Sequence, residues 1–407
     1  MSKIRIKNFG PIKEGFGEKW IDIKKVTVFI GNQGSGKSTA AKLISTLSWI
    51  EKAMDRGQLK QDELNTYNRF EKQLKYQRID HYIKDNSEIE FLGKSFHLKF
   101  SDGSFKASKA NENGYLLPKI MYVSAERNFL SVVDRPDKLK NLPSPLFTFL
   151  DEYDSARNLY WKGITLPINN AQFEYDKGNK IAHISGDGFK LRLSEASSGF
   201  QSTVPLFLVT KYLAESMTRE SDPSIKVPSI EEQRKLAKEI GRIMNDNALS
   251  EDVKQESLRQ LSSKYKPSCF INIVEEPEQN LFPKSQRNIL NSLFEYANIT
   301  NGNKLILTTH SPYIVNYLTL AIKANEVFGK VQKKQNDELK NKLSAIVPLN
   351  SLVDANESVV YEMSDDGKIS ELEKYHGLPS DENELNQRMA ESNELFANLL
   401  EIEDQCR

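Results

Sequence analysis

Residues 31–38 carry the clearest chemistry in the chain. They read Gly-Asn-Gln-Gly-Ser-Gly-Lys-Ser and match the pattern G-x-x-x-x-G-K-[ST] in full. Glycines let a backbone wrap so that successive N–H groups point at phosphate oxygens, and a helix that starts at the loop adds its positive N-terminal end. In such a loop Lys37 reaches the β- and γ-phosphates and the Ser38 hydroxyl ligates Mg²⁺. The residues expected to bind the nucleotide are Asn32, Gly34, Ser35, Gly36, Lys37, Ser38 and Thr39.

The segments on either side of this loop fit the same interpretation. Residues 26–30 are mostly β-branched and apolar, which is typical of a strand buried on both faces, and residues 40–52 have helical composition. A chance glycine-rich turn is the alternative, but it would have no reason to lie between such a strand and such a helix. The sequence therefore predicts ATP and Mg²⁺ as ligands.

A second buried strand ends in carboxylates. The apolar run 270–274 is followed by Glu275, Glu276, Pro277 and Glu278. One of these acids can hold Mg²⁺, commonly through water, and the next can polarise an attacking water molecule. Acids after a strand are often only a solvated strand end, but the phosphate-binding loop in the same chain favours the catalytic interpretation.

Two weaker patterns accompany the acids. His310 follows the apolar run 304–308, and the carboxyl ends of strands are where ligands collect in open α/β sheets, although a lone histidine is usually structural. Ser198 and Gly199 open a helical segment, where a hydroxyl and free N–H groups form an anion site. Taken alone, this serine is better explained as an ordinary helix cap.

Buried strands alternate with helical segments along the chain, which indicates an α/β core with a mostly parallel sheet. A polar helical stretch is expected over 58–85, short strands over 89–92 and 96–100, and a hairpin over 181–193. Helices are also expected over 206–217 and 284–298.

The composition excludes several other classes of protein. The 407 residues include 56 Lys and Arg against 56 Asp and Glu, so any nucleic-acid contact must come from a local patch. The only cysteines are Cys269 and Cys406, which excludes a disulfide scaffold and a multi-cysteine metal site. Neither a secretory leader nor a run of about 20 apolar residues is present, so we expect a soluble, cytoplasmic protein without a membrane partner.

The four patterns, in this order, resemble the ABC-type ATPase heads of the SMC and RecF group. They are most similar to the overcoming-lysogenization-defect (OLD) family and related phage-defence ATPases, including the ATPase subunits of the Septu (PtuA) and PARIS (AriA) systems. The strings that carry the resemblance are 31–38 (Walker A), 197–201 (signature), 274–281 (Walker B and D-loop) and 308–312 (switch histidine), and the opening 6–12 is similar to the first strand and turn of that group. The Glu-Glu-Pro-Glu and Thr-Thr-His-Ser-Pro strings are specific to it, whereas Walker A alone is not.

The resemblance implies an ATP sandwich between two copies of the chain. Ser198 and Gly199 of one copy would close on the γ-phosphate that Lys37 of the other copy holds. A homodimer would then be the minimal active unit. The roles implied for the remaining residues are general base for Glu276, Mg²⁺ ligands for Glu275 and Ser38, a γ-phosphate contact for His310 and a signature contact for Gln201.

The sequence departs from that family's pattern at three places. Glu275 stands where most ABC proteins have Asp, although the OLD-like group often has Glu there. Residues 120–128 occupy the position of the Q-loop but contain no glutamine. Arg127 is the better candidate to contact phosphate there, with Glu126 as the other choice and a plain surface arginine as the structural alternative. Pro205 lies within the expected signature helix, where it should kink the helix or shift its start.

The resemblance also sets the expected domain boundaries. Residues 1–218 and 268–350 would form the two parts of the ATPase head, and 219–267 a helical insertion. The acidic residues 351–407 would form a C-terminal interaction segment, although a solvated surface is the plainer interpretation of such a run. Within it, Leu385, Met389 and Phe396 recur at helical spacing, so the segment either packs on its own core or offers an apolar stripe to a partner.

The function expected from this resemblance is that of an ATPase subunit in a bacterial anti-phage defence system, whose ATP-dependent dimerisation regulates a separately encoded nuclease or toxin. No Asp-x-Asp follows His310, so the metal-binding Toprim nuclease of OLD proteins is not expected. A nucleic acid or a phage protein would act as the trigger. The alternatives are a RecF- or SMC-like repair ATPase that acts on DNA, with the lysines of 323–342 as a phosphate-contacting patch, and a nucleotide-bound scaffold with negligible turnover.

Overall fold

A computed structural model describes residues 1–66, 69–110, 114–133, 135–218, 240–246, 253–255, 257 and 267–406. Its centre is a six-stranded sheet in the order β15-β14-β3-β13-β12-β7. Five of these strands are parallel, and only β15 runs antiparallel to its neighbour β14. The strands are β3 (Val26–Gly31), β7 (Pro118–Val123), β12 (Cys269–Glu275), β13 (Lys304–Thr308), β14 (Ser358–Met363) and β15 (Ile369–Glu371). The expected α/β class with a mostly parallel sheet is confirmed.

Alternate residues of the central strands enter two separate hydrophobic cores. On β3, Val28 and Ile30 face the core that holds α6 (Ser198–Ser216), α9 (Pro283–Asn298) and α10 (Pro312–Lys334). Phe29 faces the opposite core, which holds α1 (Lys37–Asp55). Because both faces are covered, these strands consist of continuous apolar runs. The helix expected over 284–298 is confirmed, and the one expected over 206–217 starts earlier than predicted.

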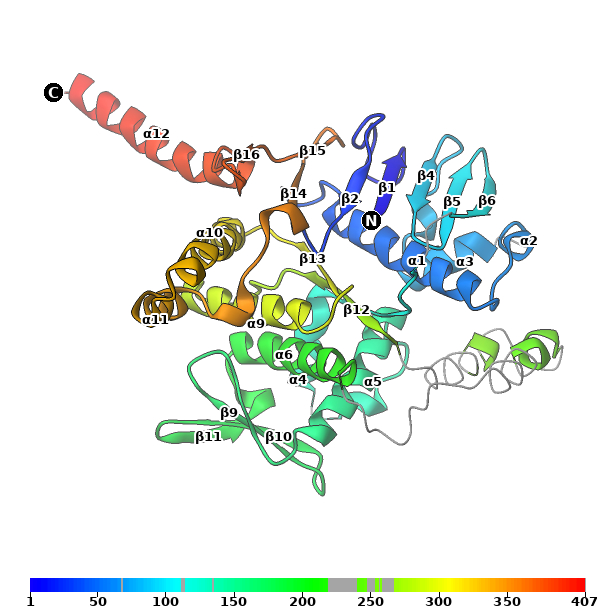
Figure 1. Cartoon of the computed structure of the whole chain (residues 1–407), viewed down its shortest axis with the longest axis horizontal. Coiled ribbons are helices and arrows are strands. Elements are labelled where there is room, and N and C mark those ends of the chain that lie inside the picture. Colours follow the sequence, from blue (N-terminus) through cyan, green and yellow to red (C-terminus); the bar gives the residue numbers. More distant parts are fainter. Residues whose placement is uncertain are drawn as a thin grey trace.

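Three antiparallel sheets surround this centre. The order β2-β1-β4-β5-β6 forms the sheet on the α1 side, drawn in blue and cyan in Figure 1, and the order β11-β10-β9-β8 forms a smaller green sheet below α6 in that view. The two sheets and the small pair β16-β17 comprise β1 (Ser2–Lys7), β2 (Ile21–Ile23), β4 (Glu88–Leu92), β5 (Phe96–Ser101), β6 (Ser104–Lys109), β8 (Ile164–Thr165), β9 (Gln172–Asp176), β10 (Ile181–Gly186), β11 (Phe189–Arg192), β16 (Lys374–Tyr375) and β17 (Leu378–Pro379). The expected antiparallel subdomain and the 181–193 hairpin are confirmed.

The polar stretch 58–85 is not one helical unit. It forms short pieces, α2 (Gln61–Leu64), α3 (Arg69–Tyr76) and the 3₁₀ turn η1 (Asp80–Tyr82), that surround the antiparallel sheet. Phe70 stacks on Phe100 and lies against Phe105, so packing on the sheet determines the shape of this stretch more than helix propensity does. The remaining short elements before α6 are η2 (Ala125–Asn128), α4 (Phe129–Val132), η3 (Pro136–Lys138), α5 (Ser144–Leu159) and η4 (Leu193–Glu195).

The C-terminal region corrects the expected boundary at residue 351. Strand β14 pairs with β3 in parallel over its whole length, with Ser358 opposite Val26 and Met363 opposite Gly31. Val359, Tyr361 and Met363 belong to the core on the α1 side, so residues 358–371 are part of the central sheet and its core and not a separate interaction segment. The composition hid this strand because the acidic residues that come after it dominate the segment.

Beyond the core the chain ends in a long helix. α11 (Asp337–Ile346), η5 (Leu349–Ser351) and η6 (Ala355–Glu357) lead from α10 to β14, and α12 (Glu384–Gln405) follows the last small strands. In Figure 1 the red α12 extends away from the body. The expected helical insertion 219–267 lies largely outside the described residues. In the part of the chain that the structure describes, no helix is both long and apolar enough to cross a membrane.

Candidate active site

The phosphate-binding loop joins β3 to α1 at the carboxyl edge of the central sheet. Gly31 and Gly36 need glycine there because their φ angles are 138° and 105°, in the region that side chains rarely adopt. A Cβ on Gly31 would lie 2.2 Å from the Met363 carbonyl oxygen, and one on Gly36 would lie 2.9 Å from the Ile12 side chain. Strand β14 and the N-terminal turn therefore hold the loop in place from two sides.

Lys37 is buried inside this loop. Its Nζ donates hydrogen bonds to the carbonyl oxygens of Gly31 at 2.9 Å and Asn32 at 2.6 Å, and it lies 3.5 Å from Ser35 Oγ. Burial lowers its pKa to about 8, against the opposing attraction of Glu276 and other acids. The ammonium is thus held where the loop's N–H groups would place a phosphate, and incoming phosphate oxygens would replace the carbonyl partners.

The two acids of Walker B, Glu275 and Glu276, stand at the end of β12, which is separated from β3 by one strand, β13. β12 pairs in parallel with β13, which brings Glu275 opposite Thr308, and the Glu276 N–H donates to the Thr308 carbonyl at 2.9 Å. Glu276 has a φ of 43°, a conformation that costs free energy in a residue other than glycine. This left-handed bend turns the chain out of the strand at the position of the candidate base.

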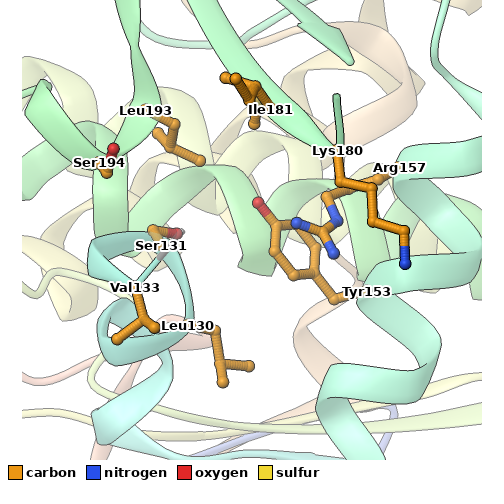
Figure 2. A pocket seen from close by; sticks show the side chains of 10 residues that line it. Leu130, Ser131, Val133, Tyr153, Arg157, Lys180, Ile181, Leu193 and Ser194 are labelled. Atoms are coloured by element: carbon orange, nitrogen blue, oxygen red, sulfur yellow. The ribbon is translucent and has the colours of Figure 1, made fainter. Parts of the chain in front are cut away.

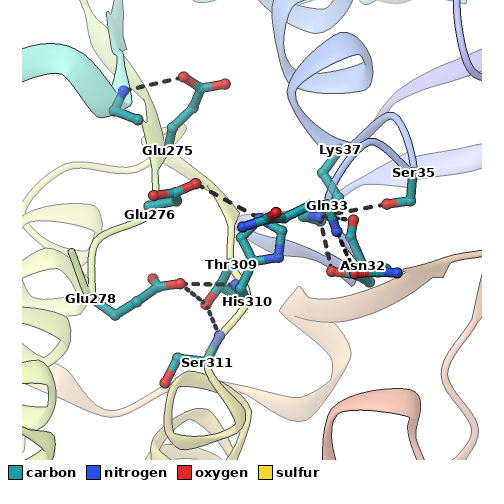
Figure 3. Close-up of polar contacts among 12 residues, drawn as sticks. Asn32, Gln33, Ser35, Lys37, Glu275, Glu276, Glu278, Thr309, His310 and Ser311 are labelled. Atoms are coloured by element: carbon teal, nitrogen blue, oxygen red, sulfur yellow. Dashed lines mark hydrogen bonds and ion pairs between the residues drawn. The ribbon is translucent and has the colours of Figure 1, made fainter. Parts of the chain in front are cut away.

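His310 faces Glu276 across this edge, as Figure 3 shows. The distance from His310 Nε2 to Glu276 Oε1 is 3.7 Å, and about a third of each side chain is exposed, at 31% and 37%. Burial, with the positive charge of Lys37 as a second cause, lowers the pKa of His310, which favours the neutral ring. The structure therefore brings Lys37, Glu276 and His310 together at one partly open place, and their catalytic roles stay a prediction.

Glu278 is a site residue whose role the sequence did not reveal. Its Oε1 accepts hydrogen bonds from the Thr309 hydroxyl at 2.7 Å and from the His310 N–H at 2.8 Å, as Figure 3 shows. Burial raises the pKa of Glu278. The carboxylate ties the Walker B turn to the histidine loop and so positions His310. The acid at this spacing was visible in Glu-Glu-Pro-Glu, but its partner could not be known without the sheet order.

Arg127 does not occupy the place that the sequence predicted. Its side chain is completely buried and its guanidinium donates to four main-chain carbonyls: Ser124 (3.2 Å), Ser202 (3.1 Å), Glu275 (2.7 Å) and Glu276 (2.6 Å). Because the group is enclosed in the chain and engaged with these oxygens, the expected phosphate contact of Arg127 is wrong. Arg127 instead joins η2, the end of β12 and the signature helix α6.

The three signature residues differ in burial. Ser198 is exposed at the first turn of α6 and Gly199 is half-buried, and no side-chain hydrogen bond caps the helix, which removes the ordinary capping interpretation. A Cβ on Gly199 would lie 3.0 Å from the Asn280 carbonyl oxygen, so glycine lets α6 pack tightly on the D-loop. Gln201 is buried and its amide donates to the Leu193 and Ser194 carbonyls, which contradicts the expected nucleotide contact of this side chain.

Pro205 leaves the start of this helix unchanged. α6 begins at Ser198 and continues through Pro205 to Ser216. Of the two predicted effects, the shift of the helix start is wrong, and the kink stays a prediction.

The C-terminal segment reaches the phosphate-binding loop, a contact that no sequence pattern predicted. Asn32 Nδ2 donates to Asp365 Oδ2 at 3.2 Å, and the charges of Asp365 and Glu384 act on Lys37. Glu384 begins α12, and its N–H donates to Glu362 Oε1 at 2.7 Å. The start of α12 is thus fixed beside the loop, although the helix lies about 350 residues further along the chain.

The residues near the loop fit a magnesium ion. Oε1 of Glu275 is buried and has no hydrogen-bond partner among the described residues, while Oε2 accepts from the Ala125 N–H at 3.2 Å. Ser38 is exposed at the first turn of α1. A free carboxylate oxygen and a serine hydroxyl are oxygen ligands of the kind that Mg²⁺ takes beside phosphates.

A cavity next to the signature turn is too small to be a second ligand site. It has a volume of about 20 Å³ and is lined by side chains of α4, α5, β10 and η4, among them Tyr153, Arg157 and Ser131, as Figure 2 shows. This volume holds about one water molecule. The rings of Tyr153 and Tyr175 lie 4.6 and 4.8 Å from the Arg157 guanidinium, which gives this arginine a packing role.

Comparisons with known proteins agree with the geometry over part of the chain. The family model described as AAA ATPase domain matches residues 247–315, the segment that contains Glu276, Glu278 and His310. No curated protein matches the chain.

Three solved structures are similar to the chain at low identity. The SMC head domain from Thermotoga maritima is 11% identical with a TM-score of 0.34, and the match covers 77% of this chain and 90% of the head domain. The Smc head domain with an extended coiled coil bound to the C-terminal domain of ScpA, derived from Pyrococcus furiosus, is 10% identical with a TM-score of 0.39, covering 97% and 100%. An SmcHead bound to the C-winged helix domain of ScpA has the same identity and TM-score, with 92% and 98% covered. Likenesses at this level carry no argument about mechanism, so the support for a P-loop ATPase rests on the loop geometry and on the family match.

Proposed function

We propose that this protein binds and hydrolyses ATP at the carboxyl edge of its central sheet. The observation that carries the proposal is the convergence of Lys37, Glu276 and His310, which follow the ends of three strands. His310 and Glu276 lie at ion-pair distance. The charge of Glu276 raises the pKa of Lys37, and the charge of Lys37 lowers the pKa of His310. A fully formed phosphate-binding loop lies on one side of this place, and a carboxylate held on a strained backbone lies on the other.

The chain's own residues supply each part of the hydrolysis. The loop N–H groups and the Lys37 ammonium bind and orient the β- and γ-phosphates. The Glu276 carboxylate accepts a proton from the attacking water, and the neutral His310 ring, fixed by Glu278, donates a hydrogen bond at the γ-phosphate. Ser38 and Glu275 would hold Mg²⁺, which when bound would supply positive charge to offset that of the phosphates.

We also propose that a second copy completes the site. Ser198 is exposed at the N-terminus of α6, and the next residue, Gly199, packs against the Asn280 carbonyl of the D-loop. A helix N-terminus with an exposed serine is suited to bind the γ-phosphate of a neighbouring copy. The two heads would then close on each other only when ATP is bound.

The biological role that we propose is control of a separately encoded nuclease or toxin in anti-phage defence. The Glu-Glu-Pro-Glu and Thr-Thr-His-Ser-Pro strings support it, through their resemblance to the OLD-like group. The rival role is direct action on DNA. Co-purification of a nuclease or toxin from the native host would support the first role, and salt-sensitive DNA binding would support the second.

The ATPase proposal is tested with Glu276→Gln. This variant should bind Mg-ATP like the wild type but release phosphate at least about a hundredfold more slowly, because the amide cannot accept the proton. It should also hold the two heads closed on ATP for longer than the wild type does, measured as slower release of bound nucleotide. Wild-type phosphate release by this variant would show that Glu276 is not the base.

A further inference from the structure

The far half of α12 presents apolar side chains that nothing in the described chain covers. The first turn is anchored on the body: the Asn383 side chain caps the helix by accepting from the Asn386 N–H, and Leu385 packs on the core. The later turns are exposed, as the projecting red helix in Figure 1 shows. Their exposed apolar residues are Leu395 (64%), Phe396 (63%), Leu399 (62%), Leu400 (46%) and Ile402 (57%).

These five side chains form one stripe with an acidic border. Leu395, Leu399 and Ile402 follow the i, i+4, i+7 spacing of a single helix face, and Phe396 and Leu400 widen it. α12 contains six acidic residues and one basic residue, Arg388, which already pairs with Glu384 and Glu391. A partner for this face therefore needs apolar residues inside a positively charged border, and a second α12 would be repelled.

The same chain carries such a surface on the hairpin of α10 and α11. Residues 323–346, here called the basic hairpin, contain six lysines and three acids. Lys323 and Lys330 pair with Glu326, and Lys342 pairs with Glu338. Lys333, Lys334 and Lys340 are exposed and make no ion pair among the described residues.

Two exposed apolar residues accompany these lysines on α11, Leu339 beside Lys340 and Ile346 at the end of the helix. Leu339 and Ile346 are 39% and 55% exposed, and their seven-residue separation places them on one face of α11. The hairpin is therefore less suited to a nucleic acid, which needs cations along a polar face, than to an apolar helix with an acidic border.

We propose that α12 of one copy docks on the basic hairpin of a second copy. In a two-fold arrangement the α12 of each copy docks on the basic hairpin of the other copy. The two contacts are then equivalent, and no docking site is left open for a third copy. The contact requires no nucleotide, because none of its residues belongs to the phosphate-binding loop or to Walker B. It would keep two copies associated before ATP closes the heads, which raises the effective concentration of one head for the other.

A charge-exchange experiment on the full-length protein without nucleotide tests this proposal. Variant A reverses α12 (Glu394→Lys, Glu401→Lys and Asp404→Lys), and variant B reverses the hairpin (Lys333→Glu, Lys334→Glu and Lys340→Glu). Sedimentation velocity should show the wild type as a dimer, and A and B alone should each dissociate at least about tenfold more readily. An equal mixture of A and B should restore the dimer, because the α12 of A then meets an acidic hairpin and the α12 of B meets the natural lysines.

Two controls complete the design. Lys106→Glu with Lys109→Glu reverses exposed charges on β6 and should leave the dimer unchanged. Leu395→Ser with Leu399→Ser should dissociate it without a change in the thermal unfolding of the body. A monomeric wild type without nucleotide, or a mixture of A and B that stays dissociated, would overturn the proposal. So would unchanged association of B together with loss of binding to a labelled DNA duplex, since the hairpin would then be a nucleic-acid surface.

Discussion

The carboxyl edge of the central sheet and the helix α12 are built on opposite principles. At the sheet edge two buried side chains are held by partners inside the chain: Arg127 binds four carbonyls and Glu278 binds two donors of the histidine loop. In α12 the first turn is anchored, and the later turns expose large apolar side chains.

The difference separates residues that fix geometry from residues that offer a surface. Buried groups at the sheet edge hold Lys37, Glu276 and His310 in place, and their loss should affect stability and turnover together. Exposed groups of α12 hold nothing in the core, so their loss should affect association alone. Substitutions in the two regions should therefore give separate sets of effects.

Lys37→Ala should have the largest effect on the site. ATP affinity should fall by at least about a hundredfold, because the phosphates lose their ammonium partner. Thermal unfolding should change little, since the lysine stands at the start of α1 and its ammonium bonds only within the adjoining loop, to Gly31, Asn32 and Ser35. Titration with a fluorescent ATP analogue and circular dichroism measure the two quantities. Unchanged affinity would remove the phosphate-binding role from this loop.

Arg127→Met should destabilise the carboxyl edge of the central sheet. Four carbonyl oxygens would lose their donor, and the free energy of unfolding should fall by about 3 kcal/mol or more. Turnover should fall as well, because the Glu276 backbone would lose the contact that fixes it. The matched control is Arg192→Met at an exposed position, which should stay within about 0.5 kcal/mol of the wild type in urea unfolding. Equal stability of the two variants would show that the Arg127 contacts do not hold the edge.

Two substitutions of Glu278 sharpen the distinction between a positioning residue and a base. Glu278→Gln keeps an acceptor for Thr309 and His310 and should retain most of the wild-type kcat. Glu278→Met removes the acceptor, releases the histidine loop, and should lower kcat about tenfold or more with little change in KM. If the glutamine variant is as inactive as Glu276→Gln, Glu278 is itself the proton acceptor.

Local sequence patterns were sufficient to predict the fold class and part of the site. The strand, the loop and the helix over 26–55 could be read from apolar runs and glycine spacing, because a P-loop is a local structure. The two acids and His310 could be placed on one edge because parallel strands end at the same side of a sheet. The α/β class could be predicted from the same alternation of strands and helices.

The features that could not be predicted depend on contacts between distant segments. Arg127 looked like a phosphate ligand because arginine prefers phosphates, and only the packing of η2 between β12 and α6 shows that it is buried. Strand β14 was hidden in an acidic tail, since its pairing with β3 joins residues more than 300 positions apart. Gln201 was predicted to contact the nucleotide because of its position in the signature motif. Its amide instead donates to the Ser194 carbonyl in the turn before α6.

A site shared between two copies is the central claim, and mixing two inactive variants tests it most directly. Lys37→Ala removes the phosphate-binding lysine, and Ser198→Arg blocks the exposed start of α6. Each variant alone should hydrolyse no ATP, because every site contains one damaged half. In an equal mixture, half of the dimers would hold one intact site, so phosphate release should recover to about a quarter of the wild-type rate. Full activity of Ser198→Arg alone, or no recovery in the mixture, would contradict the shared site.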